Sequence, residues 1–188
     1  MPPKPKVTKE QILQQAFALV REQGAGALTA KALAARLSCS TQPVFWHYAN
    51  MDELKADVYR AALGVFGQYL RRPQQGVSAY MAVGLNYIHF AMEERPLFRC
   101  LFMGDLGHAD VFGSKVEMEY ILGVIEQSAS ITGENARIIY REMWLFSHGI
   151  AAMIASGSAE FSEQELQTML GHVYRGLSRY LQSENKNS

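Results

Sequence analysis

The chain of 188 residues is predicted to be all-helical, with about nine helices. Apolar residues recur every three or four positions along most of the sequence, which is the spacing of one face of an α-helix. Alternating apolar and polar residues, the pattern of a half-buried strand, are almost absent. Hydrophobic residues make up 48% and charged residues 19% of the chain, a balance that favours packed cores over disorder. The length fits two modest domains.

The first helix is expected to begin just after Thr8, which has the spacing of a capping box with Gln11. Such a box satisfies backbone N–H groups that the start of a helix leaves without partners. Gly24 and Gly26 are expected to end the helix, since glycine readily adopts the backbone found past helix ends. Four apolar residues mark the buried face: Ile12, Ala16, Leu19 and Val20.

Two helices of about eight residues follow, joined by a three-residue turn at 38–40. Thr29 is a favourable N-cap for the first of them, and Ser40 for the second. Pro43 is tolerated in the first turn of the second helix, where no backbone donor is needed. The core of this small bundle is expected to include Leu33, Leu37 and Val44. Two short helices at this spacing predict a helix-turn-helix motif.

The rest of the chain is predicted to hold six more helices, separated by breaks that contain Pro, Gly or Ser. Their expected ranges are 52–72, 77–94, 96–103, 114–130, 133–155 and 161–182. The stretch 104–113 is expected to be a loop. We therefore predict two domains, a helix-turn-helix DNA-binding domain over residues 1–50 and a larger helical domain over residues 51–188.

The formal net charge is zero, but its two halves are opposite in sign. Residues 51–188 carry a net charge of −4, because 16 acidic side chains outnumber 12 basic ones. Residues 1–50 carry a net charge of +4, from six basic and two acidic side chains: Lys4, Lys6, Lys9, Arg21, Lys31 and Arg36 against Glu10 and Glu22. Charge asymmetry between halves favours a nucleic-acid partner for the basic half. The three lysines before residue 10 are interpreted either as a phosphate-tracking arm or as a solvated tail.

In a helix-turn-helix motif, the first residues of the second helix enter the major groove of DNA. The residues in that place are Ser40, Thr41, Gln42 and Pro43. Glutamine binds an adenine edge through two hydrogen bonds, and threonine and proline offer apolar contact to a thymine methyl group. Thr41 and Gln42 have no evident packing role, so the sequence favours them as base readers.

Aromatic residues continue the same helix, and Phe45, Trp46 and His47 are expected against the sugar-phosphate backbone. For Trp46 a place in the core beside the following helix is an equal alternative, while Tyr48 and Cys39 are expected to be packing residues. At the start of the preceding helix, Thr29 and Lys31 suit a phosphate, because unpaired N–H groups and the helix dipole favour an anion there.

The run from Leu28 to Leu54, LTAKALAARLSCSTQPVFWHYANMDEL, resembles the DNA-binding domain of TetR-type (TetR/AcrR) transcriptional regulators. The likeness lies in the threonine that opens a helix, the small-residue turn, the Phe45-Trp46-His47 run and Asn50. Serine replaces the glycine often found at position 38, Phe45 replaces a tyrosine, and Met51 replaces a lysine, with Lys55 one turn further on. These departures imply weaker binding to the DNA backbone.

The resemblance implies a ligand-responsive regulator, a repressor in most such proteins, that binds a palindromic operator as a homodimer. Residues 51–188 would bind the effector and form the dimer. The effector implied is a small apolar or aromatic compound that lowers the affinity for DNA.

The last two predicted helices carry apolar residues seven apart, the repeat of a helix–helix seam. Small residues around Gly149 would let a neighbouring helix approach closely. We expect these helices to form a four-helix dimer interface, with ordinary intrachain packing as the alternative. The candidate interface residues are Ile150, Ile154, Leu166, Leu170, Val173 and Leu177.

The middle of the chain is rich in methionine and aromatic residues, which line adaptable apolar pockets and also fill ordinary cores. Trp144, His148 and Gly149 are similar to a signature of one subgroup of TetR-type proteins, and Trp144 and His148 share a helix face. The candidate effector-pocket residues are Tyr87, Phe90, Phe102, Met103, Trp144 and His148. Core packing is the alternative for each of them.

Several other functions are disfavoured. The two cysteines, Cys39 and Cys100, lack the spacing of a redox or metal motif. No histidine pair has the spacing of a helical metal site, and no serine or cysteine lies in a nucleophile motif. We therefore expect neither enzymatic activity nor a metal or other cofactor. No apolar run of about 18 residues indicates a membrane span, and the start lacks the apolar core of a secretory signal, so a cytoplasmic protein is expected.

Two alternatives stay open. One is a regulator that answers to a protein partner instead of a small molecule. The other is an all-helical carrier or enzyme whose first three helices only pack together.

Overall fold

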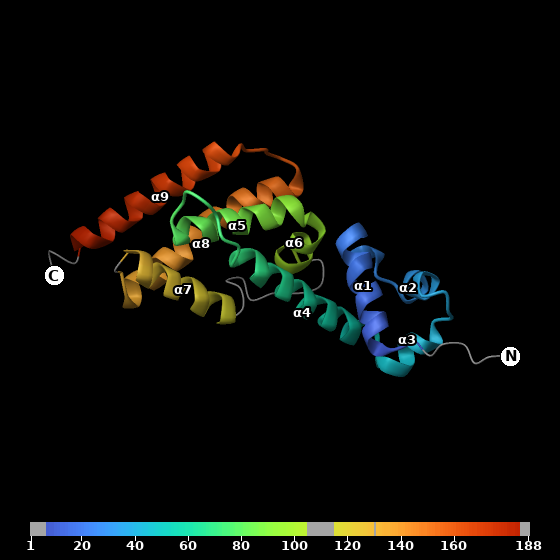
Figure 1. Ribbon diagram of the computed structural model, residues 1–188. Coiled ribbons are helices and arrows are strands. Elements are labelled where there is room, and N and C mark those ends of the chain that lie inside the picture. Colours follow the sequence, from blue (N-terminus) through green and yellow to red (C-terminus); the bar gives the residue numbers. More distant parts are fainter. Residues whose placement is uncertain (1–6, 105–114, 130, 185–188) are drawn as a thin grey trace. The chain divides into compact units, whose positions relative to one another are not determined.

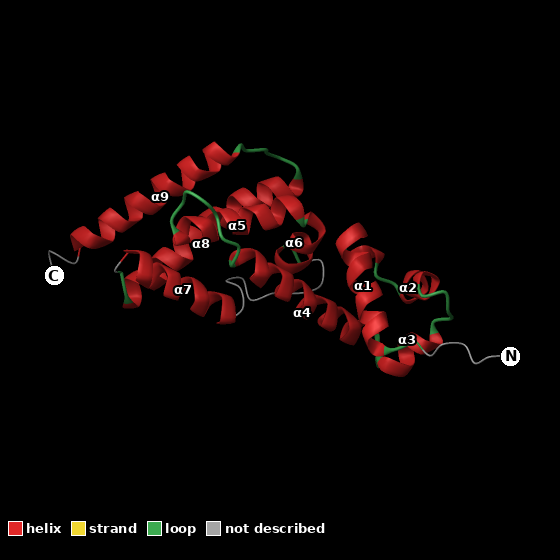
Figure 2. Cartoon of the chain, viewed as in Figure 1, coloured by secondary structure: helices red, strands yellow, loops and turns green. Residues whose placement is uncertain are grey.

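A computed structural model describes residues 7–104, 115–129 and 131–184 of the chain. Within these residues the structure is all-helical and contains no strand, as predicted (Figures 1 and 2). The helices are α1 (Lys9–Gln23), a short 3₁₀ helix η1 (Ala25–Ala27), α2 (Ala30–Arg36), α3 (Gln42–His47), α4 (Met51–Leu70), α5 (Ala79–Glu93), α6 (Arg95–Phe102), α7 (Lys115–Ala129), α8 (Gly133–Ser156) and α9 (Glu163–Glu184). Residues 105–113 of the loop expected at 104–113, and the basic residues Lys4 and Lys6, lie outside the described part.

The start and the end of α1 are as predicted. Gln11 N donates to Thr8 Oγ1 at 3.2 Å, and Thr8 N donates to Gln11 Oε1 at 3.0 Å, which completes the capping box. The helix ends at Gly24, whose φ of 85° is unfavourable for residues with a Cβ atom. The four predicted apolar residues of α1 are buried.

The turn between α2 and α3 is longer than predicted. Thr29 Oγ1 accepts a hydrogen bond from Ala32 N at 3.1 Å and caps α2 as expected. However, α3 is preceded by Thr41 rather than Ser40, so five residues separate the two helices. Ser38 lies in this turn with φ 53°, the left-handed region, and it is the one described non-glycine residue there. The turn therefore has two more residues than predicted, because its length depends on the backbone conformation at Ser38, which the spacing of apolar residues does not indicate.

The first compact unit contains the described residues 7–65 and 94–104, so α6 packs with the N-terminal helices. Arg21 on α1 donates from Nε to Glu94 Oε2 at 2.8 Å, and its Nη2 pairs with the other oxygen of the same, buried carboxylate. Fully buried apolar side chains from α1, α2, α3, α4 and α6 form the core: Ile12, Ala16, Val20, Leu33, Val44, Leu54, Val58, Leu97 and Phe98.

The second compact unit contains the described residues from Phe66 to Glu93 and from 115 onward. Its helix α5 packs against α7, α8 and α9 and is buried along most of its length. Buried Asn86 fixes the connection that precedes α5, because its Nδ2 donates to Arg72 O at 2.7 Å and its Oδ1 accepts from Gln74 Nε2 at 2.8 Å.

The change from one compact unit to the other lies within α4, between Val65 and Phe66, whereas the predicted domain boundary at residues 50 and 51 lies between α3 and α4. Helix α6 also belongs to the first unit, where it packs on α1. None of the helices in the described part of the chain is both long enough and apolar enough to cross a membrane.

Candidate functional sites

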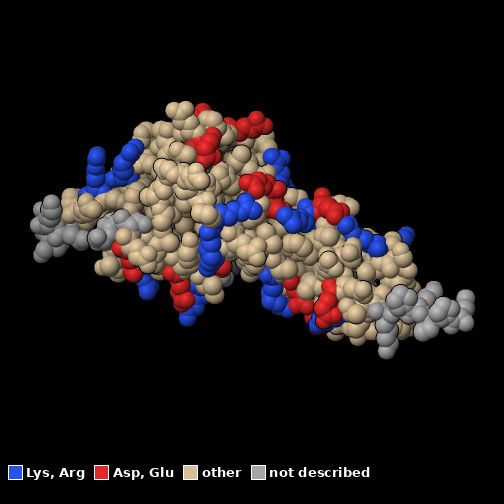
Figure 3. All heavy atoms as spheres, viewed as in Figure 1, with Lys and Arg blue, Asp and Glu red and all other residues tan. Residues whose placement is uncertain are grey.

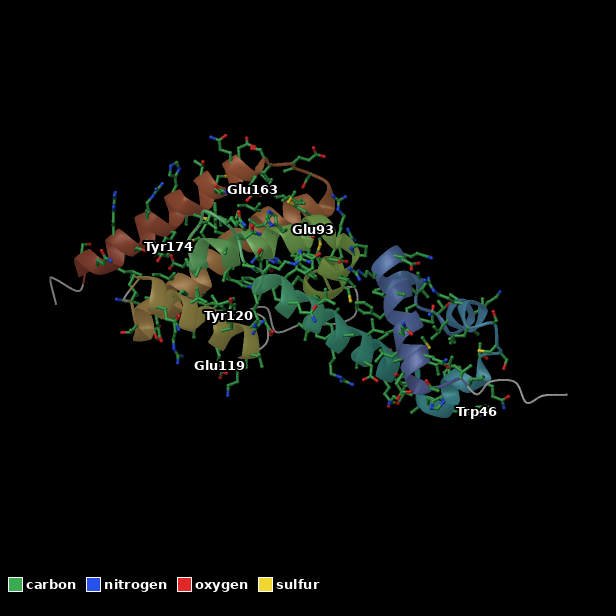
Figure 4. The ribbon with its side chains drawn as sticks, viewed as in Figure 1. Trp46, Glu93, Glu119, Tyr120, Glu163 and Tyr174 are labelled. Atoms are coloured by element: carbon green, nitrogen blue, oxygen red, sulfur yellow. The ribbon has the colours of Figure 1, made fainter. Side chains whose placement is uncertain are left out.

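Helix α3 has a buried face and an exposed face of different character. Val44 and the following Tyr48 are buried, which fixes the helix against the core of the first unit. The other side presents Gln42, Phe45 and Trp46, with exposed fractions of 47% for Phe45 and 66% for Trp46. Figure 4 labels Trp46 on α3. The alternative that Trp46 is a core residue is therefore wrong.

The other predicted groove residues surround this exposed face. Ser40 and Thr41 are exposed and Pro43 is half-buried, as base readers require. Tyr48 packs in the core as predicted, with Lys9 Nζ 4.6 Å from its ring centre, and burial raises the pKa of its phenol.

His47, which is predicted to contact the DNA backbone, also has a partner within the protein. Its Nε2 lies 3.0 Å from the carbonyl oxygen of Val7, so the ring donates a hydrogen bond to the segment before α1. This contact connects α3 to the start of the described chain. A phosphate contact by His47 would therefore share the ring with a structural hydrogen bond.

Some of the predicted phosphate contacts are exposed, and others have partners within the protein. Thr29 and Lys31 are exposed at the start of α2, as expected. Lys55 Nζ lies 2.9 Å from Asp52 Oδ1, so its charge is partly engaged within α4. Asn50 Oδ1 accepts from Glu53 N at 2.9 Å, so the asparagine of the motif caps the start of α4.

Several basic side chains of the first 50 residues are paired with carboxylates in the folded unit. Arg36 Nη1 donates to Glu22 Oε2 at 2.8 Å, and Lys9 Nζ lies 3.9 Å from Glu53 Oε1. The described residues of the unit hold eight basic and six acidic side chains: Lys9, Arg21, Lys31, Arg36, Lys55, Arg60, Arg95 and Arg99 against Glu10, Glu22, Asp52, Glu53, Asp57 and Glu94. Figure 3 shows both signs interspersed on the visible face of the N-terminal helices.

A groove runs beside α3, and sequence reasoning missed one of its walls. Glutamines of α1 form this wall, and Ser38, Ser40, Pro43 and Trp46 line the other side. The glutamines are Gln11, Gln14 and Gln15. Their polar side chains at helical spacing were the available signal, but that pattern is also the ordinary signal of a solvated helix face.

The second unit contains a partly open cavity of about 50 Å³. It lies among α5, α7, α8 and α9, and two of the predicted pocket residues, Tyr87 and Trp144, line it. Three further residues of its wall, Tyr80, Tyr140 and Tyr174, were not predicted (Figure 4 shows Tyr174 on α9). The other lining residues are Ser78, Met81, Val83, Gly84, Ile121, Met143, Ser147 and Leu170.

His148 does not line the cavity but contacts two residues that do, Trp144 and Tyr87. The two rings are stacked, with centroids 4.7 Å apart and an interplanar angle of 7°. His148 Nδ1 also lies 3.0 Å from the hydroxyl oxygen of Tyr87, so the two side chains share a hydrogen bond whose direction is set by the tautomer of the imidazole. Burial lowers the pKa of His148, which favours the neutral form. His148 therefore positions two wall residues without lining the cavity.

The other three predicted pocket residues do not line the cavity. Phe90 is fully buried in the core of the second unit, where its ring centre lies 5.2 Å from those of Phe66 and Tyr69. Phe102 and Met103 belong to the end of α6 in the first unit, and Phe102 packs against Phe98.

Four of the six predicted interface residues are buried inside the second unit: Ile150, Ile154, Leu166 and Leu170. The alternative of intrachain packing fits these four, because the seam of α9 faces α5 and α8. Val173 and Leu177 are half-buried on α9.

The exposed apolar side chains of α8 and α9 are different ones, Leu145 (52% exposed), Met153 (45%) and Tyr180 (60%). Gly149 lies between Leu145 and Met153 on one face of α8, and Gly176 precedes Tyr180 by one turn of α9. A Cβ atom built on either glycine would meet no described atom within 4 Å. We call Leu145, Gly149 and Met153 with Val173, Gly176, Leu177 and Tyr180 the α8–α9 surface.

Comparison with models of known protein families finds no match, and a search of curated proteins finds none. Solved structures do match. One is TetR from Acinetobacter baumannii AYE, with a TM-score of 0.62 and 15% identity, covering 95% of this chain and 98% of that one. The chain has the TetR fold. A TetR variant from the same bacterium, in complex with minocycline, matches with a TM-score of 0.61 and 16% identity over the same shares of both chains. The predicted fold class is thereby confirmed.

Proposed function

We propose that this protein is a transcriptional regulator of the TetR type, which binds DNA as a homodimer and releases it when a small ligand binds. The exposed face of α3 carries the proposal. Large aromatic side chains this exposed are unusual on a folded unit, and beside polar readers on a helix-turn-helix they suit a DNA groove. The TetR fold over nearly the whole chain supports the same function.

The composition of the α3 face indicates how DNA would be read. Gln42 is exposed in the first turn and offers both a donor and an acceptor to an adenine edge. Pro43 and Phe45 offer apolar surface to thymine methyl groups. The helix residues 42–47 include neither lysine nor arginine, the usual partners of guanine. A half-site rich in A·T pairs is the expected target.

Dimerisation is supported by the α8–α9 surface. Its apolar side chains flank glycines that leave room for the backbone of another helix. A two-fold axis would bring the surface against its own copy, since a two-fold interface is self-complementary. The dimer would present two α3 helices to half-sites about 34 Å apart, or one turn of DNA.

Ligand response is supported by the cavity and by the neighbour that was solved with minocycline bound. A ligand changes DNA affinity only if it favours one of two conformations of the protein. Helix α4 connects the units covalently, since residues 51–65 belong to the first and 66–70 to the second. A shift of the second unit would therefore be transmitted through α4.

The proposal is tested by selecting bound fragments from genomic DNA with the full-length protein and measuring affinity against salt concentration. We expect a palindromic site, one dimer per site, and affinity that falls steeply with salt. Binding that shows no sequence preference, or no binding, would contradict the proposal and favour a carrier or enzyme. A reporter gene behind the selected site distinguishes repression, the expected outcome, from activation.

The same assay separates the two kinds of signal. Release of the selected site by small compounds would support a ligand-responsive regulator. Sequence-specific binding that responds only to a cell extract, and loses that response after protease treatment, would instead indicate a protein partner.

A further inference from the structure

We infer that the cavity of the second unit binds an uncharged, single-ring aromatic compound that carries a hydrogen-bonding group, as phenol does. Anions and cations of the same size would be rejected. The inference rests on the proposed function for the role of the site, and it narrows the class of effector. It is carried by the charge, the ring geometry, the polar groups and the size of the cavity.

Charge comes first. All of the described residues that line the cavity are uncharged. Burial raises the pKa of Tyr80 and of Tyr87 and lowers that of His148, so these groups stay neutral near neutral pH. The carboxylate of Glu117, one turn before Ile121 on α7, faces Arg71 at 3.9 Å. A charged ligand would lose its hydration without gaining an opposite charge.

The walls suit a flat ring. Tyr80 and Tyr174 are 4.8 Å apart between ring centres at an angle of 45°. Tyr87 meets Trp144 edge to face at 6.2 Å. Tilted and edge-to-face contacts of this kind are the favourable geometries between aromatic rings. A further ring would extend the cluster, whereas an aliphatic ring of equal size lacks those contacts.

Two serines of the lining, one from α8 and one from the residues before α5, provide hydrogen-bonding groups. Ser147 on α8 is buried, and Ser78 before α5 is exposed at the rim. Ser78 Oγ accepts from Met81 N at 3.2 Å, and its own O–H is a donor. A ligand hydroxyl both donates and accepts, so it can form a hydrogen bond with either serine.

The size of the cavity limits the ligand to one ring. About 50 Å³ is less than the roughly 150 Å³ of an engineered cavity that binds benzene, so a ring must displace part of the wall. Met81 and Met143 can move, since methionine side chains are flexible. Elsewhere in the lining, α5 and α9 are in close contact, because a Cβ atom on Gly84 would lie 3.3 Å from Leu170 Cδ1. A second ring would have to separate these two helices.

Trp144 reports on binding directly. The chain has two tryptophans, Trp46 and Trp144, so W46F leaves Trp144 as the emitter; it serves only as an optical background. We would titrate this variant with phenol, cyclohexanol, benzoate and benzylamine, which is cationic at neutral pH. Phenol should change the emission saturably, and the other three should bind at least about tenfold more weakly.

A pair of matched variants tests the location. G84A adds a methyl group to the wall, and G123A adds one to α7 where a Cβ atom meets no described atom within 4 Å. Both replace a helical glycine by alanine, and G123A should keep or raise the unfolding temperature. In G84A the new Cβ atom lies 3.3 Å from Leu170 Cδ1, so the Leu170 side chain must shift slightly, and a measured unfolding temperature checks that the variant is folded. G84A should weaken phenol binding at least about tenfold, and G123A should not.

The inference is overturned if cyclohexanol, benzoate or benzylamine binds as tightly as phenol, if G84A binds phenol as G123A does, or if none of the four compounds changes the Trp144 emission. DNA binding by the unmodified protein is measured separately. If the protein binds phenol but not DNA, the proposed function is contradicted and the inferred ligand class is supported. If it binds DNA but not phenol, the proposed function is supported and the inferred ligand class is contradicted.

Discussion

Two surfaces of this protein expose large apolar side chains, and their neighbours differ. On α3, Phe45 and Trp46 stand among hydrogen-bonding residues such as Gln42. On the α8–α9 surface, Leu145 and Met153 flank a glycine that leaves room for a close neighbour. Polar groups beside aromatic rings suit a partner with a patterned, hydrogen-bonding edge. Small residues beside aliphatic ones suit the smooth side of another helix. Exposure alone therefore does not indicate the partner, but the residues around it do.

The largest effect is expected on the α8–α9 surface, with Leu145→Glu. In a two-fold dimer each copy would bring one carboxylate into the apolar interface, without an opposite charge. We expect the dissociation constant of the dimer to rise at least about 100-fold, equivalent to about 3 kcal/mol. Sedimentation equilibrium measures this constant, and DNA affinity should fall with it.

Met92→Glu is the matched control, because Met92 is an exposed methionine on α5 that lies outside the α8–α9 surface. It should leave the dimer intact. If both variants dimerise as the unmodified protein does, the α8–α9 surface is not the interface. Exposed apolar side chains beside a glycine would then not indicate a helix partner on this surface.

On the α3 surface, Trp46→Ala is expected to reduce DNA affinity without unfolding the protein. Tryptophans in interfaces often contribute about 2 kcal/mol or more when truncated. Trp46 is largely exposed, so the free energy of unfolding should change by no more than about 0.5 kcal/mol. Fluorescence anisotropy with the selected site and urea unfolding measure the two quantities.

Val44→Ala gives the opposite result on the same helix, since Val44 is fully buried. It should lower the free energy of unfolding by about 2 kcal/mol. If Trp46→Ala lowers the free energy of unfolding as much as Val44→Ala does, Trp46 is a packing residue and not a DNA contact.

A smaller effect is expected for Gln42→Ala. This variant should lose about 1–3 kcal/mol of discrimination at one base pair, while its discrimination at the other base pairs of the site stays the same. Replacing thymine by uracil in the site removes the methyl groups that Pro43 and Phe45 are proposed to contact. Binding to the uracil site should therefore also weaken. Uniform weakening by Gln42→Ala across all sites would show that Gln42 does not read a base, and equal binding to both sites would exclude methyl contacts.

The sequence predicted the features that depend on neighbours in the chain. The capping box of Thr8 and Gln11, the cap at Thr29 and the end of α1 at Gly24 are local, and all three are present. The length of the turn before α3 was missed, because it depends on Ser38 adopting a left-handed backbone that serine seldom occupies.

Features that depend on distant residues were not predictable from periodicity. Arg21 and Glu94 are 73 positions apart, and their contact joins α6 to the first unit. Phe90 and Tyr87 are both buried residues of α5, yet one belongs to the core and the other to the cavity wall. The seven-residue repeat of α9 correctly indicates a helix partner, but it does not show that Leu166 and Leu170 meet helices of the same chain.

The smallest effect concerns His148, which supports the cavity and precedes Gly149 of the α8–α9 surface. Burial holds its pKa below the ordinary value of 6.5, so the unfolded chain takes up a proton at a higher pH than the folded one. Stability contributed by neutral His148 is fully present above pH 6.5 and is lost as the pH falls through and below that value. Asparagine at this position cannot titrate, so His148→Asn should flatten this part of the profile of unfolding free energy against pH. An unchanged slope in the variant would show that another group titrates there, and that the stack on Trp144 does not depend on the charge of His148.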